Sequence, residues 1–498
     1  MSLHLSKSKY CNAVQCPKML WLKTYRPELF DDSVMNESVL VTGNEVGDLA
    51  MGLFGDYTEV TEYTDERIDI KKMLVRTEEE IQKGTHIICE ASFSYEGNYC
   101  AVDILKNHGD NNVEIYEVKS STSIHDIYYD DAAYQNYVLT NLGYNVQKVC
   151  IVHIDSSYVR HGDLELNKLF KINDVTDIVK GKYEEVGRYI RYLQSYIEAT
   201  DEPEKDISMD CYSPYDCGFY RYCSRNLPSP NVFDIASLQK RMAFKLYNSG
   251  ILSFEDVYQK NAVKENYMIQ VEHELKDCEP YIDKAFIKGF MHTLSYPIYF
   301  LDFETCQFAI PQYDDSKPYQ QIPFQYSLHY IEHENGELLH KEFLAYPGKD
   351  PRRDLAEALC RDIPENVCVT AYNMGFEKGR IKEMAELFPD LSDHLMNIRE
   401  NIKDLMIPFQ KKKYYSKAMQ GSYSIKYVLP ALFPDDPSLD YHNLEGVHKG
   451  DEASQTFIRM QTMEKDELEV WRGYLLKYCC LDTYAMVKVW EKLIEASV

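Results

Sequence analysis

The 498-residue sequence contains no apolar run of about 18 residues, and it starts without the apolar stretch of a signal peptide. These absences argue against a membrane span and against secretion, so we expect a cytoplasmic protein with no membrane partner. A G-x-x-x-x-G-K-[ST] phosphate loop is also missing, which disfavours ATP use. Basic residues are few, because 54 Lys and Arg face 80 Asp and Glu, for a net charge of −26. That sum alone disfavours a nucleic-acid partner, but binding depends on local charge.

Three blocks follow one another along the chain. Residues 1–227 and residues 294–498 both mix strand and helix patterns, so we expect each of them to form an α/β domain. Residues 228–293 have a helical pattern and are expected to form a connector. The stretch NLPSPN at 226–231 marks a linker, because it places two prolines among small polar residues.

Acidic residues of the C-terminal block recur beside predicted strands and helices. Asp302 and Glu304 end a short apolar strand and are two residues apart, which places both carboxylates on one face. Two such carboxylates repel each other and need a shared cation, for which Mg²⁺ or Mn²⁺ suits oxygen ligands. Glu377 opens a helix after another apolar strand. Tyr478 and Asp482 are four residues apart, on one face of a helix.

The order D-x-E, N-x-x-F-E and Y-x-x-x-D resembles the DEDD exonucleases of the RNase H-like superfamily, in the variant with tyrosine in the third motif. This resemblance implies an RNase H-like fold, a two-metal site and 3′→5′ exonuclease activity. The implied metal ligands are Asp302, Glu304, Glu377 and Asp482. Tyr478 would position the attacking water, and Asn373, which begins the second motif, would contact nucleic acid. Glu377 stands where the family usually has aspartate.

A basic segment lies between the second and third motifs. Residues 401–430 contain six lysines and one acid, a local charge of +5, interleaved with tyrosines. Lysines contact phosphates and tyrosines stack on bases, as a groove for single-stranded nucleic acid requires. The residues expected to bind are Lys411, Lys412, Lys413, Tyr414 and Tyr415. The alternative is a solvated basic loop.

The N-terminal block contains a second candidate site on a predicted hairpin, with strands at 99–105 and 113–120. Asp103 lies on the first strand, while Glu117 and Lys119 share one face of the second. A carboxylate pair can bind a metal ion, and the lysine can orient or help to deprotonate the attacking water. The helix predicted at 130–142 carries Gln135.

Cysteines flank this second site. Cys211, Cys217 and Cys223 fall in one polar segment, and Cys16 precedes them by about 200 residues, with Cys11 as its rival. One early and three late cysteines around D…E-x-K resemble the RecB-like PD-(D/E)XK nucleases that carry an iron–sulfur cluster, a group that includes the CRISPR-associated RecB-like exonucleases.

This resemblance implies a restriction-endonuclease-like fold. Asp103 and Glu117 would be metal ligands, and Lys119 and Gln135 would be catalytic. The implied ligands of a [4Fe–4S] cluster are Cys16, Cys211, Cys217 and Cys223. Four cysteines could equally bind zinc. The family's upstream histidine has no counterpart in this sequence, and Glu45 or Asp48 could replace it.

The leading hypothesis is therefore a metal-dependent nuclease with two nuclease-like domains, a fusion that resembles a bacterial two-domain family. The implied reaction is exonucleolytic hydrolysis of single-stranded DNA, with RNA as an alternative substrate, and a helicase or repair partner follows only by analogy. The competing hypothesis is a nucleic-acid-binding or scaffold protein with one or both sites inactive and a structural cluster. The missing histidine and the glutamate at position 377 support that second hypothesis.

Overall fold

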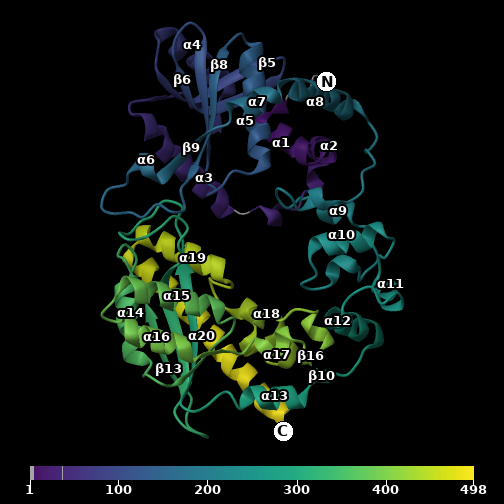
Figure 1. Cartoon of the computed structure of the whole chain (residues 1–498), viewed down its shortest axis with the longest axis vertical. Coiled ribbons are helices and arrows are strands. Elements are labelled where there is room, and N and C mark those ends of the chain that lie inside the picture. Colours follow the sequence, from purple (N-terminus) through teal and green to yellow (C-terminus); the bar gives the residue numbers. More distant parts are fainter. Residues whose placement is uncertain (1–4, 36) are drawn as a thin grey trace. The chain divides into compact units, whose positions relative to one another are not determined.

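The computed structural model describes residues 5–35 and 37–498, and its contacts divide the chain into two units (Figure 1). The first unit ends at Asn226 and also includes Phe308–Tyr319. The second comprises Leu227–Gln307 and Gln320–Val498. Each unit combines a sheet of parallel and antiparallel strands with helices, which confirms the mixed α/β class. None of the described helices is long and apolar enough to cross a membrane.

The first unit contains a seven-stranded sheet in the order β2-β5-β6-β7-β8-β9, with β1 paired to β6. Its strands are β1 (Leu5–Ser6), β2 (Thr58–Glu59), β5 (Ile87–Tyr95), β6 (Asn98–Asn107), β7 (Asn112–Lys119), β8 (Asn145–Ile154) and β9 (Phe170–Asp174). Strands β6 and β7 are antiparallel neighbours, so the predicted hairpin is confirmed. Strand β8 runs parallel to β7, and the crossover between them is α5 (Asp126–Asn141).

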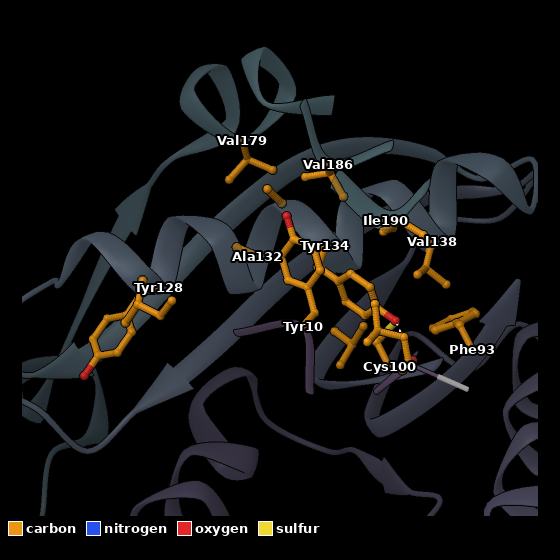
Figure 2. Packing of buried hydrophobic residues seen from close by; sticks show 14 of the residues in the cluster. Tyr10, Phe93, Cys100, Tyr128, Ala132, Tyr134, Val138, Val179, Val186 and Ile190 are labelled. Atoms are coloured by element: carbon orange, nitrogen blue, oxygen red, sulfur yellow. Dashed lines mark hydrogen bonds between the residues drawn. The ribbon is translucent and has the colours of Figure 1, made fainter. Parts of the chain in front are cut away.

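Helices pack on this sheet through aromatic side chains. The other helices of the unit are α1 (Lys7–Gln15), α2 (Pro17–Tyr25), α3 (Glu37–Met51), α4 (Ile70–Lys83), α6 (Leu166–Leu169), α7 (Thr176–Gly181), α8 (Tyr183–Glu198) and α9 (Tyr220–Cys223). Figure 2 shows Tyr10 of α1 against Tyr134 of α5, with the ring centroids 4.7 Å apart. The Tyr134 hydroxyl also donates a hydrogen bond to the Leu5 carbonyl at 2.7 Å. These contacts hold the first turn of α1 over the sheet.

The segment between β11 and β12 belongs to the first unit, which the sequence does not indicate. The Arg160 guanidinium donates a hydrogen bond to the Pro311 carbonyl at 2.9 Å. The Tyr319 hydroxyl donates to the Ser120 carbonyl at 2.6 Å, one residue beyond β7. The chain thus returns to the first unit for twelve residues, from Phe308 to Tyr319.

The second unit contains a five-stranded sheet in the order β13-β12-β11-β14-β15. Its strands are β11 (Ile298–Cys306), β12 (Ile322–Ile331), β13 (Leu339–Leu344), β14 (Cys368–Ala371) and β15 (Ile402–Asp404). The first three pair antiparallel, while β14 and β15 continue the sheet parallel to β11. Strand β11 is longer than predicted, so Asp302 and Glu304 lie within it and not at its end. Pairing with β12 carries the strand on past a register shift between Glu304 and Thr305.

Helices cover this second sheet, and a small helical region precedes it. The helices that follow β13 are α14 (Arg352–Asp362), α15 (Gly375–Leu387), α16 (Ser392–Asn401), α17 (Ile407–Gln410), α18 (Ile425–Leu432), α19 (Gly450–Arg459) and α20 (Lys465–Ser497). The predicted connector contains α10 (Lys240–Asn248), α11 (Phe254–Gln259), α12 (Glu265–Lys276), β10 (Tyr281–Ile282) and α13 (Lys284–Met291). Strand β10 pairs with β16 (Tyr414–Tyr415), which ties the connector to the basic segment.

Candidate metal centres in the two units

The acidic residues of the three C-terminal motifs come together in the second unit. Burial raises the pKa of Asp302 well above its usual range, and the charges of Asp482, Glu304 and Glu377 raise it further. One oxygen of Asp302 and one of Glu304 lie within 4.8 Å of each other and of the Cys479 sulfur. Strand β11, α15 and α20 therefore bring together four carboxylates from three motifs that are distant in the sequence.

We define this carboxylate cluster as Asp302, Glu304, Glu377 and Asp482; Glu304 and Glu377 are buried, and the two aspartates are half-buried. Burial raises the pKa of Glu377 to about 8 and that of Asp482 to about 6. One carboxylate oxygen of Glu377 is buried and makes no hydrogen bond. Buried carboxylates of this kind are stable as anions only with a cation beside them, and their oxygens suit Mg²⁺ or Mn²⁺.

Two tyrosines and a lysine adjoin the carboxylate cluster. The Tyr441 hydroxyl donates a hydrogen bond to Asp482 Oδ1 at 2.7 Å, and its ring centroid is 6.0 Å from that of Tyr478. The Lys426 Nζ lies 5.6 Å and 5.9 Å from these two ring centroids. Its charge lowers the pKa of Asp482 and of Glu304, against the larger opposing effect of burial. Tyr441 belongs to no recognisable motif, so only the fold reveals its role.

A cleft of about 740 Å³ opens beside these residues, with Lys426 and Tyr441 in its wall. Lys449 also lines it, together with three aspartates, so two positive and three negative side chains line the cleft. The volume lies within the range of about 300–1,000 Å³ that is typical of ligand sites. The cleft is therefore large enough for a nucleotide-sized group.

The basic segment is less accessible than predicted. Lys412 and Tyr415 are buried, and the Lys412 ammonium donates a hydrogen bond to the Gly421 carbonyl at 3.3 Å. Their prediction as nucleic-acid contacts is therefore wrong, because the pairing of β16 with β10 buries this part of the chain. Lys413 forms an ion pair with Asp283 at 3.0 Å. Of the other predicted contacts, Lys411 and Asn373 are exposed, and Tyr414 is half-buried.

The first unit gathers its predicted residues around Glu117. The Lys119 ammonium donates to Glu117 Oε1 at 2.7 Å and to Asp131 Oδ2 at 2.5 Å. The Gln135 amide donates to Glu117 Oε2 at 2.6 Å and to Asp131 Oδ1 at 3.1 Å. Asp103 accepts a hydrogen bond from the Val118 N–H at 2.6 Å. Asp131 is a further residue of this site that the sequence patterns did not predict. Its position four residues before Gln135 places both side chains on one helix face.

An unpredicted cation lies among these carboxylates. The Lys7 Nζ is 2.7 Å from Glu117 Oε1, 3.7 Å from Asp103 Oδ1 and 3.9 Å from Asp131 Oδ1. It reaches them from the first turn of α1, which the Tyr10 contact holds over the sheet. The Lys7 ammonium thus occupies the position that a metal ion bound to Asp103 and Glu117 would need.

A further acid, Glu90 of β5, adjoins the same group. Burial, together with the charges of Glu117 and Asp48, raises the pKa of Glu90 to about 7. Burial and the Glu117 charge raise the pKa of Asp103 to about 8. Of the two acids considered as substitutes for the missing histidine, both are exposed, and only Asp48 is close enough for its charge to act on Glu90.

Four cysteines line one narrow cavity of about 20 Å³ in the first unit. They are Cys16, Cys211, Cys217 and Cys223. Cys11 lies elsewhere, beside the carboxylates, where burial and the Asp131 charge raise the pKa of its thiol. Within residues 5–35 and 37–498, no three cysteine sulfurs all lie within 4.8 Å of one another. The cavity thus brings together the predicted ligands, but not in the close contact of a cysteine-only zinc site.

Comparison with known proteins identifies one domain. A domain of unknown function, DUF2779, matches residues 299–424. No curated protein and no solved structure matches the chain. The matched region includes Asp302, Glu304 and Glu377 and ends before Asp482.

Proposed function

We propose that the protein is a metal-dependent nuclease, and that its second unit hydrolyses phosphodiester bonds exonucleolytically at the carboxylate cluster. The observation that carries this proposal is the convergence of four acidic side chains, two buried and two half-buried, from β11, α15 and α20. When bound, two divalent ions would activate the attacking water and stabilise the leaving oxygen. Asp302, Glu304, Glu377 and Asp482 would hold them.

The chain's own residues have complementary tasks. Tyr441 orients Asp482 through its hydrogen bond. Burial and the neighbouring carboxylates keep the pKa of Tyr478 far above its usual range, so its hydroxyl stays protonated and can donate a hydrogen bond to the attacking water. Lys426, the lysine of the cleft wall whose charge also acts on Asp482 and Glu304, can contact a phosphate of the substrate.

The strand order supports the RNase H-like part of the proposal. Three antiparallel strands are followed by two parallel ones, with the first strand at the centre carrying Asp302 and Glu304. This is the arrangement that the resemblance to RNase H-like exonucleases implies. We propose single-stranded DNA as the substrate, since the net charge of −26 opposes tight duplex binding.

For the first unit, we propose a PD-(D/E)XK-type centre built from Asp103, Glu117 and Lys119, with the cysteine cavity holding a [4Fe–4S] cluster or zinc. The proximity of Gln135 and Lys119 to Glu117 supports this. The ammonium of Lys7 between the carboxylates favours a second candidate function for this unit alone, namely nucleic-acid binding without cleavage.

The test uses end-labelled single-stranded DNA, duplex DNA and RNA with Mg²⁺ or Mn²⁺. The wild type is compared with Asp302→Asn, with Lys119→Ala and with the double variant. Glu386→Gln, an exposed change on the same helix as Glu377, serves as the control. Compared with Lys119→Ala, the double variant should lower activity by about 1,000-fold, because bound metal supplies several kcal/mol of transition-state stabilisation. Equal activity in the double variant and Lys119→Ala, or no metal-dependent product from the wild type, would refute the proposal.

A further inference from the structure

A second group of metal-ligating side chains lies on the sheet of the second unit, separate from the carboxylate cluster. His329 of β12 and His340 of β13 are direct partners across the two strands. Their ring centroids are 4.4 Å apart. One nitrogen of each ring and the Cys480 sulfur, from α20, all lie within 4.8 Å of one another. A sheet and a helix thus direct two imidazoles and a thiol toward one point.

Hydroxyl groups orient both rings. His329 Nδ1 forms a hydrogen bond with Thr483 Oγ1 at 2.8 Å, and His340 Nε2 forms one with Ser327 Oγ at 2.9 Å. The two hydroxyls are themselves hydrogen-bonded at 2.6 Å. Histidines that bind metals characteristically have such partners on one ring nitrogen, which fixes the ring and leaves the other nitrogen to the ion.

The charge state of the group also suits a metal ion. Burial lowers the pKa of His329 to about 4, and burial lowers that of His340 as well, so both rings are neutral at pH 7. Neutral imidazole is the form that binds metal. Glu342 follows His340 by two residues and so lies on the same face of β13, but it is not part of the group of three ligand atoms.

We propose that His329, His340 and Cys480 bind a zinc ion, with a water molecule as the fourth ligand. Two imidazoles and a thiolate are borderline-to-soft ligands, which favour Zn²⁺ over Mg²⁺ or Mn²⁺. Tetrahedral zinc at the usual bond lengths separates such ligand atoms by about 3.3–3.6 Å. The three ligand atoms lie within 4.8 Å of one another, so they need to approach by at most about 1.5 Å to reach this spacing. The Cys480 thiol releases its proton to solvent as the zinc–sulfur bond forms.

The position of this site suggests its role. His340 lies on β13, at the end of the strand order of this sheet, and is exposed, so solvent ions can reach it. Cys480 lies on α20 between Tyr478 and Asp482. An ion bound by both would fasten the outer strand to the helix that supplies two residues of the proposed active site. Zinc here would position α20 without contacting the substrate.

The experiment measures zinc bound to the full-length protein by mass spectrometry, after dialysis against Zn²⁺ with excess Mg²⁺ present. Cobalt substitution then provides a thiolate-to-cobalt charge-transfer band as a direct reporter of a cysteine ligand. The site variants are His340→Ala and Cys480→Ser. The matched controls are His333→Ala, which is also exposed, and Cys360→Ser, which is also half-buried.

We expect each site variant to lose one equivalent of zinc, with affinity at this site reduced by more than about 100-fold. Cys480→Ser should also lose part of the cobalt–thiolate band, while both controls keep the wild-type values. Because His340 is exposed, His340→Ala should retain its circular dichroism spectrum, which separates loss of zinc from loss of fold. Unchanged zinc content in both site variants would overturn the proposal. The variant Cys16→Ser removes any zinc bound in the four-cysteine cavity, so that zinc can be subtracted from the total. None of these measurements depends on nuclease activity.

Discussion

Replacing Glu377 by glutamine should make the metal-free second unit more stable as pH rises, relative to the wild type. Burial raises the pKa of Glu377 from 4.5 to about 8. At pH values between 4.5 and about 8, the Glu377 carboxyl group has released its proton in the unfolded chain but keeps it in the folded chain. The wild type therefore loses stability as pH rises from about 4.5 to about 8, by about 3 kcal/mol at pH 7.

Glutamine carries no charge at any pH, so the variant lacks this loss. An unpaired buried amide costs about 1–3 kcal/mol at every pH, which lowers the variant's stability by a constant amount. The stability of the variant relative to the wild type should thus increase by about 3–4 kcal/mol from pH 5 to pH 8. Added Mg²⁺ should stabilise the wild type and not the variant, because binding to the folded state alone shifts the unfolding equilibrium.

The assay is urea unfolding in a chelator, followed by tryptophan fluorescence. Of the three tryptophans, Trp471 and Trp490 lie in the second unit, so their signal reports its unfolding. Glu386→Gln removes an exposed acid from the same helix and should show no such pH dependence. A difference between Glu377→Gln and wild type that stays constant from pH 5 to pH 8 would refute the reasoning. Equal stabilisation of both proteins by Mg²⁺ would refute the metal assignment.

Two further predictions concern the first unit. Lys7→Ala should strengthen Mn²⁺ binding there by at least about tenfold, because the Lys7 ammonium is 2.7 Å from Glu117 and competes with the ion. Isothermal titration calorimetry measures this affinity, and an unchanged value would show that Lys7 does not compete. Cys16→Ser should remove the iron or zinc of the cysteine cavity, whereas Cys11→Ser should not, because Cys11 does not line that cavity. Elemental analysis measures the bound iron and zinc, and the visible absorption spectrum reports an iron–sulfur cluster. Equal loss of metal in Cys16→Ser and Cys11→Ser would contradict the assignment.

Local patterns predicted much of both candidate sites. The two-residue spacing of Asp302 and Glu304 placed them on one face, and the structure keeps them within 4.8 Å of each other. The hairpin that carries Asp103, Glu117 and Lys119 was predicted for the same reason, since strand periodicity depends on neighbouring residues alone. The position of Gln135 on the following helix also agrees with the structure, where it donates to Glu117.

Burial was harder to predict. The lysines and tyrosines of the basic segment resemble a nucleic-acid groove by composition, yet Lys412 and Tyr415 are buried. The cause is the pairing of β16 with β10, which lies more than 130 residues earlier in the chain. Composition describes what a segment contains, whereas burial depends on which distant segment covers it.

The sequence by itself determined the order of the acidic motifs, the face that each pair shares and the mixed α/β class. Only the tertiary structure decided which further groups reach those motifs: Lys7 between the carboxylates of the first unit, Tyr441 on Asp482, and Cys16 in place of Cys11 in the cysteine cavity. The physical reason is the difference between distance along the sequence and distance in space. Periodicity acts over a few residues, but a charge, a hydrogen bond or a thiol acts on whatever the fold brings within a few ångströms.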